Sequence, residues 1–169
     1  NNANFETITV WDIHSDVSLE MLNNTVNRPA SDFVVPHLNK NEFIVAPDHG
    51  AKERAMRCSD LSGNSFLQMS KKRDPNTGYL SLFSLDSLVD DFEKDYGAMI
   101  VDDICDGGRT FIGGGNILKQ HIHGPLRLFV THGIFSAGFD GLLEVFDEIL
   151  VANLMTDAPL PPQVKVIGS

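Results

Sequence analysis

Short apolar runs alternate with amphipathic stretches along most of the chain. The runs are hydrophobic at nearly every position, instead of every second one, and each has the length of a strand. They predict strands at residues 8–13, 43–46, 65–69, 79–83, 98–101, 126–131 and 148–152. The stretches between them have helical length and spacing. They predict helices at residues 16–24, 51–61, 85–94, 110–121 and 138–146.

This order of elements predicts an α/β fold. A strand that is apolar on both faces is typical of a parallel sheet that helices cover on both sides. The proline-broken tail is predicted to end in a short edge strand. The length of 169 residues suits one domain, and a hydrophobic fraction of 42% suits a substantial core. We therefore predict a single domain over residues 1–169, with a mostly parallel, doubly wound sheet between two layers of helices.

Composition and charge exclude several classes of partner. No apolar run approaches the ~20 residues that cross a bilayer, and the first residues do not resemble a signal peptide, so no membrane partner is expected. The net charge is −10, and the basic residues cluster only at 71–73. Nucleic acid is disfavoured as a partner because its binding depends on neutralising phosphates. Cys58 and Cys105 are far apart in the sequence, which favours reduced thiols and a cytoplasmic location.

The segment "MIVDDICDGGRTF" carries the strongest chemical signal. Asp102 and Asp103 fall where a predicted strand ends, and ligands bind beyond the carboxyl ends of parallel strands. Gly107 and Gly108 allow positive φ and expose backbone N–H groups, and Thr110 is predicted to cap the next helix, whose N-terminus favours an anion. Carboxylates accept hydrogen bonds from vicinal hydroxyls, and a glycine-rich turn suits a phosphate. A sugar phosphate carries both groups.

The same segment resembles the signature loop of the type I phosphoribosyltransferase fold. Further segments resemble those of the ribose-phosphate diphosphokinases, also called phosphoribosyl pyrophosphate synthetases. They are "ITVWDIHS" at 8–15, "FIVAPDHGAKERA" at 43–55 and "FVTHGIFSAG" at 129–138. All of these segments occur in the order of that family and with about its spacing. The resemblance is to the C-terminal half of the family, which implies that the chain, whose first residue is not Met, is part of a longer two-domain enzyme.

The resemblance implies transfer of the diphosphoryl group of ATP to the C1 hydroxyl of ribose 5-phosphate, with Mg²⁺ as cofactor. Phosphoribosyl pyrophosphate and AMP are the implied products. Asp102 and Asp103 would hold the ribose hydroxyls or a magnesium-bound water. The 5-phosphate would be bound by Asp106, Gly107, Gly108, Arg109 and Thr110. His14 and Asp48 match metal-contacting positions of the family.

The basic segment at 71–73 matches a K-x-R pattern in a loop of the family. This implies that Lys71 and Arg73 are the catalytic cations that stabilise charge on the transferring phosphates. A negatively charged chain that must accept ATP and a sugar phosphate needs such cations.

Departures from the family pattern leave alternatives open. The phosphate turn of the family usually reads D-[ST]-[AG]-G-T, whereas this chain has Gly107 and Arg109 at two of those positions. The added guanidinium of Arg109 suits a larger or more anionic acceptor than ribose 5-phosphate, so another ribosyl phosphate, such as ADP-ribose, is an alternative acceptor. Part of the family's adenine pocket comes from the other half, often across a subunit contact, which implies a homo-oligomer. The alternatives are a phosphoribosyltransferase that consumes phosphoribosyl pyrophosphate and a non-catalytic, nucleotide-binding regulatory paralogue.

Overall fold

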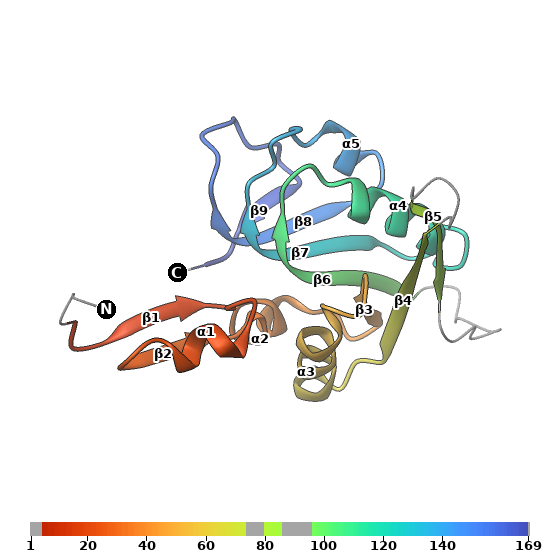
Figure 1. Cartoon of the computed structure of the whole chain (residues 1–169). Coiled ribbons are helices and arrows are strands. Elements are labelled where there is room, and N and C mark those ends of the chain that lie inside the picture. Colours follow the sequence, from red (N-terminus) through yellow and green to blue (C-terminus); the bar gives the residue numbers. More distant parts are fainter. Residues whose placement is uncertain (1–4, 74–79, 86–95, 169) are drawn as a thin grey trace.

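The central element is a seven-stranded sheet, shown in the computed structural model of Figure 1. The structure describes residues 5–73, 80–85 and 96–168, without the side chains of 16, 71–73 and 80–85. The strand order is β5-β4-β3-β6-β7-β8-β9. The strands are β3 (Glu42–Ala46), β4 (Phe66–Arg73), β5 (Leu80–Leu85), β6 (Gly97–Cys105), β7 (Leu126–Gly133), β8 (Glu148–Leu154) and β9 (Val164–Val166). All neighbours are parallel except β4 and β5, and this confirms the predicted, mostly parallel sheet.

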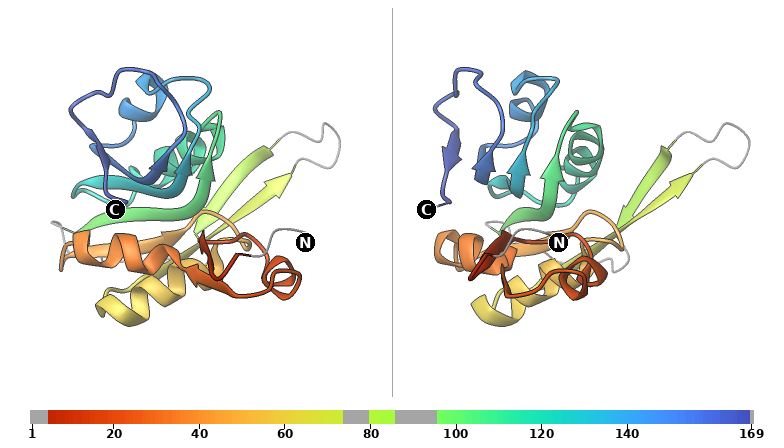
Figure 2. Two further views of the ribbon diagram at one scale, coloured as in Figure 1. Left: turned by 90° about the vertical axis from the view of Figure 1, so that its left-hand side faces the viewer. Right: turned by 60° about the vertical axis from the view of Figure 1, so that its left-hand side comes forward.

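Helices cover both faces of this sheet. Figure 2 shows α2 (Ala30–Val34) and α3 (Lys52–Ser62) on one side, with α4 (Arg109–Leu118) and α5 (Asp140–Leu143) on the other. Successive side chains of a strand point to opposite faces, so each central strand supplies both cores. On β3, Ile44 packs into the core under α2 and α3. Its neighbour Val45 belongs to the core under α4 and α5, which explains why these strands are apolar at every position.

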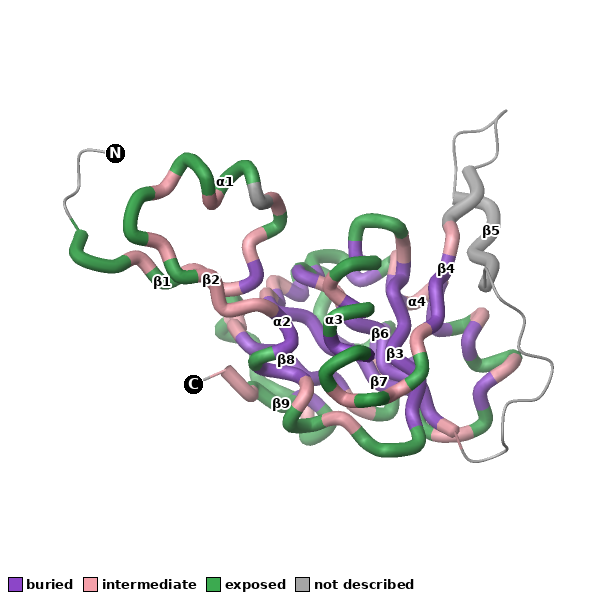
Figure 3. Tube along the Cα trace, turned by 90° about the horizontal axis from the view of Figure 1, so that it is seen from below, coloured by how far each residue is buried: buried purple, intermediate pink, exposed green. Residues whose placement is uncertain are grey.

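A small parallel sheet lies beside the main one. It consists of β1 (Ile8–Trp11) and β2 (Thr25–Arg28), with α1 (Asp16–Glu20) between them. Figure 3 shows that this unit is mostly exposed or partly exposed. β2, α2 and the 3₁₀ helix η1 (Val35–His37) were not predicted, because elements of three to five residues are too short to show a period.

Several predicted boundaries need correction. β6 runs four residues past the predicted end, to Cys105, because β7 stays paired with it: Asp102 pairs with Val130, and Cys105 with Gly133. The helices predicted at 16–24 and 138–146 are shorter, at Asp16–Glu20 and Asp140–Leu143.

The helix predicted at 85–94 cannot begin at its first residue, because Leu85 is the last residue of β5. The rest of that range lies outside the described residues. Within the described parts of the chain, every helix is too short or too polar to cross a bilayer.

Candidate functional site

An acidic pocket of about 350 Å³ lies where β6 and α4 meet. Its walls come from the turn after β3, the last part of β6 and the first turn of α4. It brings together Asp48 and all the residues expected from the acid–glycine segment. The lining residues are Asp48, Asp102, Asp103, Ile104, Asp106, Gly107, Gly108, Arg109, Thr110 and Phe111.

The glycine turn leads directly into α4. Gly108 is the N-cap of this helix, with φ 73°, a left-handed conformation that favours glycine. Thr110 was expected to cap the helix and does not, because α4 already begins at Arg109 and no side chain caps it. The first bond of the helix runs from Ile112 N–H to Gly108 C=O, so the preceding N–H groups have no partner within the helix. A helix N-terminus of this kind attracts an anion.

Asp102 and Asp103 belong to the continuation of β6, not to a loop beyond its end. One guanidinium joins them: Arg54 Nη1 lies 3.3 Å from Asp102 Oδ1, and Arg54 Nη2 lies 3.2 Å from Asp103 Oδ2. The backbone N–H of Asp103 also donates to Asp102 Oδ1 at 2.9 Å. The side chains of Asp102 and Asp103 are only 16% and 10% exposed. The pair is therefore held in place before any ligand arrives.

The two carboxyl groups differ in acidity. The pKa of Asp102 is raised to about 7, mainly by burial and also by the negative charges of Asp103 and Asp48, while the hydrogen bond from Asp103 N–H and the charge of Arg54 act to lower it. Burial also acts to raise the pKa of Asp103, but a hydrogen bond from His14 and the charge of Arg54 outweigh it and lower that pKa. Near neutral pH the pair therefore combines a firmly ionised carboxylate with one that titrates.

His14 lies outside the lining of the acidic pocket but contacts one of its residues. His14 Nδ1 is 2.6 Å from Asp103 Oδ2, although the His14 side chain is 84% exposed. The hydrogen bond with Asp103 and the carboxylate charge raise the pKa of His14. Asp48 Oδ1 accepts a hydrogen bond from Ala51 N–H at 3.2 Å. Within the described residues, no three His, Cys, Asp or Glu side chains are grouped as ready metal ligands.

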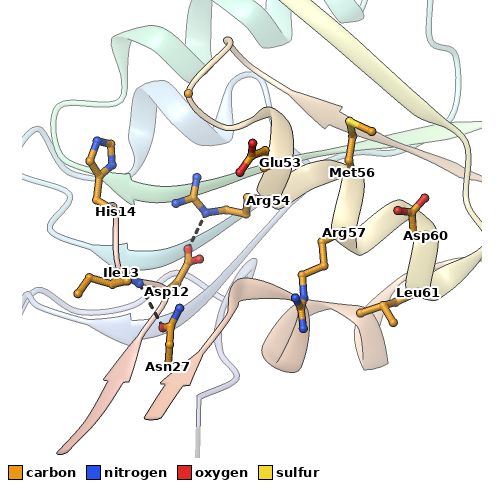
Figure 4. A pocket seen from close by; sticks show the side chains of 11 residues that line it. Asp12, Ile13, His14, Asn27, Glu53, Arg54, Met56, Arg57, Asp60 and Leu61 are labelled. Carbon is orange, nitrogen blue, oxygen red and sulfur yellow. Dashed lines mark hydrogen bonds and ion pairs between the residues drawn. The ribbon is translucent and has the colours of Figure 1, made fainter. Parts of the chain in front are cut away.

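A second hollow, of about 740 Å³, lies beside α3 (Figure 4). Two of its lining residues, His14 and Arg54, contact the aspartate pair. Asp12, His14 and Arg54 line it, and Arg54 Nε donates to Asp12 Oδ2 at 2.7 Å. Asp12 and Arg54 are not among the site residues predicted from the sequence. Asp12 lies in the segment "WDIHS" and Arg54 in "PDHGAKERA", so the segments that resemble the family contain both residues. Nothing local in the sequence indicated that their side chains meet.

The two expected catalytic cations can be placed only by their backbone. Lys71 and Arg73 lie in β4, opposite Phe83 and Leu80 of β5, with an irregularity in register between Lys72 and Arg73. Their side chains lie outside the described residues, so their role remains a prediction.

Known proteins resemble the chain in sequence. It is 28% identical over 174 aligned residues to a ribose-phosphate pyrophosphokinase of Mycoplasmopsis pulmonis, covering 96% of the chain and 52% of that protein. It is 30% identical over 158 residues to the enzyme of the same name from Pyrococcus furiosus, covering 88% and 53%. The chain thus spans about half the length of the curated relatives that it matches. No family model matches it.

Solved structures resemble the chain in fold. A phosphoribosylpyrophosphate synthetase from Mycobacterium smegmatis superposes with a TM-score of 0.79 at 22% identity, covering 98% of this chain and 55% of that one. An adenine phosphoribosyltransferase from Thermoanaerobacter pseudethanolicus gives a TM-score of 0.57 at 16% identity, covering 75% and 78%. These findings confirm the predicted fold class and the resemblance to the ribose-phosphate diphosphokinases.

Proposed function

We propose that the chain is the sugar-phosphate-binding, C-terminal domain of a ribose-phosphate diphosphokinase. The reaction transfers the β,γ-diphosphoryl group of ATP to the C1 hydroxyl of ribose 5-phosphate. The hydroxyl oxygen attacks the β-phosphorus and loses its proton, the bond from that phosphorus to the α-phosphate oxygen breaks, and AMP leaves. Curated relatives that bear this name match 88–96% of the chain, which supports this reaction over the consumption of phosphoribosyl pyrophosphate.

One observation carries the proposal: a pocket of about 350 Å³ combines paired carboxylates with the amide-rich start of a helix. Asp102 and Asp103 are suited to accept hydrogen bonds from the 2- and 3-hydroxyls of ribose. The backbone N–H groups from Gly107 to Thr110 are suited to the 5-phosphate. Gripping the sugar at both ends fixes the direction of the C1 hydroxyl, and orientation is a large part of catalysis in phosphoryl transfer.

Positive charge must balance the phosphates. Like charges 4 Å apart repel by about 4 kcal/mol at an effective dielectric constant near 20, so several unbalanced phosphate–carboxylate contacts would prevent binding. Arg109 is exposed, lines the pocket and can supply one cation. Lys71 and Arg73 are proposed to stabilise the charge on the transferring phosphates. A Lys71→Ala variant should therefore lose kcat far more than its affinity for ribose 5-phosphate.

The donor set of the pocket fits Mg²⁺. Asp48 and Asp102 present carboxylate oxygens to the same cavity, and each adds to the negative charge around the other. Mg²⁺ is commonly held by one or two carboxylates together with substrate phosphates, so a ready-made trio is not required. Asp48 and Asp102 are the residues that would hold the ion here. His14 would act on the site indirectly, through its hydrogen bond with Asp103. The ion would supply charge neutralisation for the phosphates.

Acceptor, assembly and location form part of the same proposal. Ribose 5-phosphate is the proposed acceptor, and Arg109 allows a larger ribosyl phosphate such as ADP-ribose. The chain is proposed to act in a homo-oligomer. Cys58 and Cys105 are both buried, free thiols, which supports a reducing, cytoplasmic location.

The test is AMP formation by the complete gene product, with ATP, Mg²⁺ and a panel of ribosyl phosphates. We expect AMP that depends on both Mg²⁺ and ribose 5-phosphate. Asp103→Asn removes a charged hydrogen-bond acceptor worth roughly 1.5–3 kcal/mol, so kcat/KM should fall about 10- to 100-fold. The exposed Asp157→Asn is the matched control and should leave the rate unchanged. No AMP with any ribosyl phosphate would refute the proposed reaction.

A further inference from the structure

Asp12 is a buried carboxylate that the proposed chemistry does not use. It follows β1, is 7% exposed and has a left-handed backbone with φ 47°. Its Oδ1 accepts a hydrogen bond from Ala30 N–H at 3.3 Å. Its Oδ2 accepts from Thr131 Oγ1 at 2.8 Å and from Arg54 Nε at 2.7 Å. A positive φ is sparsely populated for residues other than glycine, so Asp12 keeps this conformation because its hydrogen-bond partners enforce it.

The partners of Asp12 come from separate parts of the fold. Thr131 belongs to β7 and is fully buried, Ala30 begins α2, and Arg54 lies in α3. The backbone N–H of Asp12 also donates to Arg28 C=O at 2.8 Å. Asp12 is therefore fixed from the main sheet, a helix and the small sheet together. Its carboxylate is a rigid anchor for the guanidinium.

The anchored guanidinium then reaches the sugar-binding pair. With Nε held by Asp12, the Nη1 and Nη2 groups of Arg54 face Asp102 and Asp103 at 3.3 and 3.2 Å. The Arg54 side chain is 10% exposed. Because a guanidinium is planar, fixing its Nε edge also fixes the direction of its other donors. The orientation of both pocket carboxylates thus depends on a contact outside the pocket.

We propose that Asp12 and Thr131 are positioning residues for sugar-phosphate binding, acting through Arg54 on Asp102 and Asp103. This inference rests on the proposed function, since the pair must be the part of the site that holds the ribose hydroxyls. Thr131 orients Asp12, Asp12 orients the guanidinium, and the guanidinium holds the two carboxylates in place. Neither Asp12 nor Thr131 lines the acidic pocket.

The cleanest perturbation is at Thr131, whose side chain bonds to Asp12 and does not line the acidic pocket. Thr131→Val keeps the shape of the side chain and removes the hydroxyl that donates to Asp12. Thr131→Ser keeps the hydroxyl and loses a methyl group, so it should restore the positioning role. Ser59→Ala is the control for general destabilisation, because it removes another buried hydroxyl, which donates to Asn64 C=O at 2.6 Å.

Binding of ribose 5-phosphate to the complete gene product, measured by calorimetry, is the main readout. We expect Thr131→Val to weaken it by about tenfold, the loss of one hydrogen bond to a charged group. Thr131→Ser should bind within about twofold of the wild type, and Ser59→Ala should bind like the wild type even if its melting temperature falls. In turnover, Thr131→Val should raise the KM for ribose 5-phosphate and leave the KM for ATP nearly unchanged.

A second readout does not depend on catalysis. In ¹⁵N–¹H spectra, the Nε–H signal of Arg54, assigned with Arg54→Lys, should be protected from solvent exchange in the wild type and in Thr131→Ser. Thr131→Val should lose that protection. A Thr131→Val protein that keeps wild-type affinity overturns the inference, as does equal weakening in all three variants. Wild-type binding without AMP formation would refute only the proposed reaction, whereas a wild type that does not bind ribose 5-phosphate overturns both.

Discussion

Substituting alanine for Gly108 tests the phosphate turn most sharply. Gly108 caps α4 with φ 73°, and a Cβ added there would lie 3.1 Å from Leu142 Cδ2 and 3.2 Å from Leu142 Cγ. Leu142 is itself 2% exposed and belongs to the core beneath α4. The substitution therefore meets two obstacles, an unfavourable backbone conformation and a neighbour with little room to move.

The backbone conformation and the contact with Leu142 each contribute a separate free-energy cost. A left-handed conformation costs a non-glycine residue roughly 1–2 kcal/mol. Alanine recovers about 0.4–1 kcal/mol because it restricts the unfolded chain. Forcing a methyl group into a packed core typically adds about 1–3 kcal/mol. We therefore expect Gly108→Ala to lower the free energy of unfolding by about 2–3 kcal/mol.

Other glycines of the chain provide matched controls. Gly63 has φ 76° with nothing within 4 Å of its added Cβ, so Gly63→Ala measures the backbone cost alone, about 1 kcal/mol or less. Gly107 has open space and no positive φ, so Gly107→Ala should change stability by less than about 0.5 kcal/mol.

Urea-induced unfolding measures the change in the free energy of unfolding for each of the three glycine variants, and calorimetry measures their affinity for ribose 5-phosphate. Gly108→Ala should bind at least about tenfold more weakly in its folded form, because the turn must shift away from Leu142. Gly63→Ala should keep its affinity. If Gly108→Ala is no less stable than Gly63→Ala and binds equally well, the reasoning about this turn is wrong.

Three further predictions follow from charge and burial. The carboxyl group of Asp102 is neutral below its pKa of about 7, so the affinity for ribose 5-phosphate should rise as the pH passes that value. In Asp102→Asn only the weaker rise from the ligand's own phosphate should remain. Calorimetry over this pH range tests this, and the same pH profile in Asp102→Asn and the wild type would contradict it. Arg127→Met removes the ion pair of Glu42, which is 2% exposed, at 3.0 Å and leaves its carboxylate only the hydrogen bonds from Asn39. The same substitution removes one ion pair of Glu148, so the free energy of unfolding in urea should fall by about 3–5 kcal/mol, with no change in affinity. Burial raises the pKa of Cys58 and Cys105 to about 12, so a thiol reagent at pH 8 should modify them only after unfolding; rapid labelling of the folded protein would refute this.

The sequence predicted the sheet because its central strands are apolar on both faces. Met99 and Ile100 are adjacent on β6 and pack into opposite cores, so the pattern has no polar face to obscure it. The end of β6 could not be found in this way. Asp102 and Asp103 look like the end of a strand by polarity, but backbone pairing with β7 continues through them regardless of their side chains.

The candidate site was predictable where its contacts are local. The acids and glycines around Gly108 are close in sequence, and one turn brings them to the same pocket. The anchor of that site was not predictable from local signals. Arg54 and Asp12 are 42 residues apart, and Thr131 lies 119 residues from Asp12, so only the folded sheet brings them together.

The central claim is that the acidic pocket grips a pentose phosphate at both ends. A crystal structure of the complete gene product with ribose 5-phosphate tests it directly. We expect the phosphate at the N–H groups between Gly107 and Thr110, and the 2- and 3-hydroxyls within hydrogen-bond distance of Asp102 and Asp103. A sugar phosphate bound elsewhere, with this pocket empty at saturating ligand, would contradict the account.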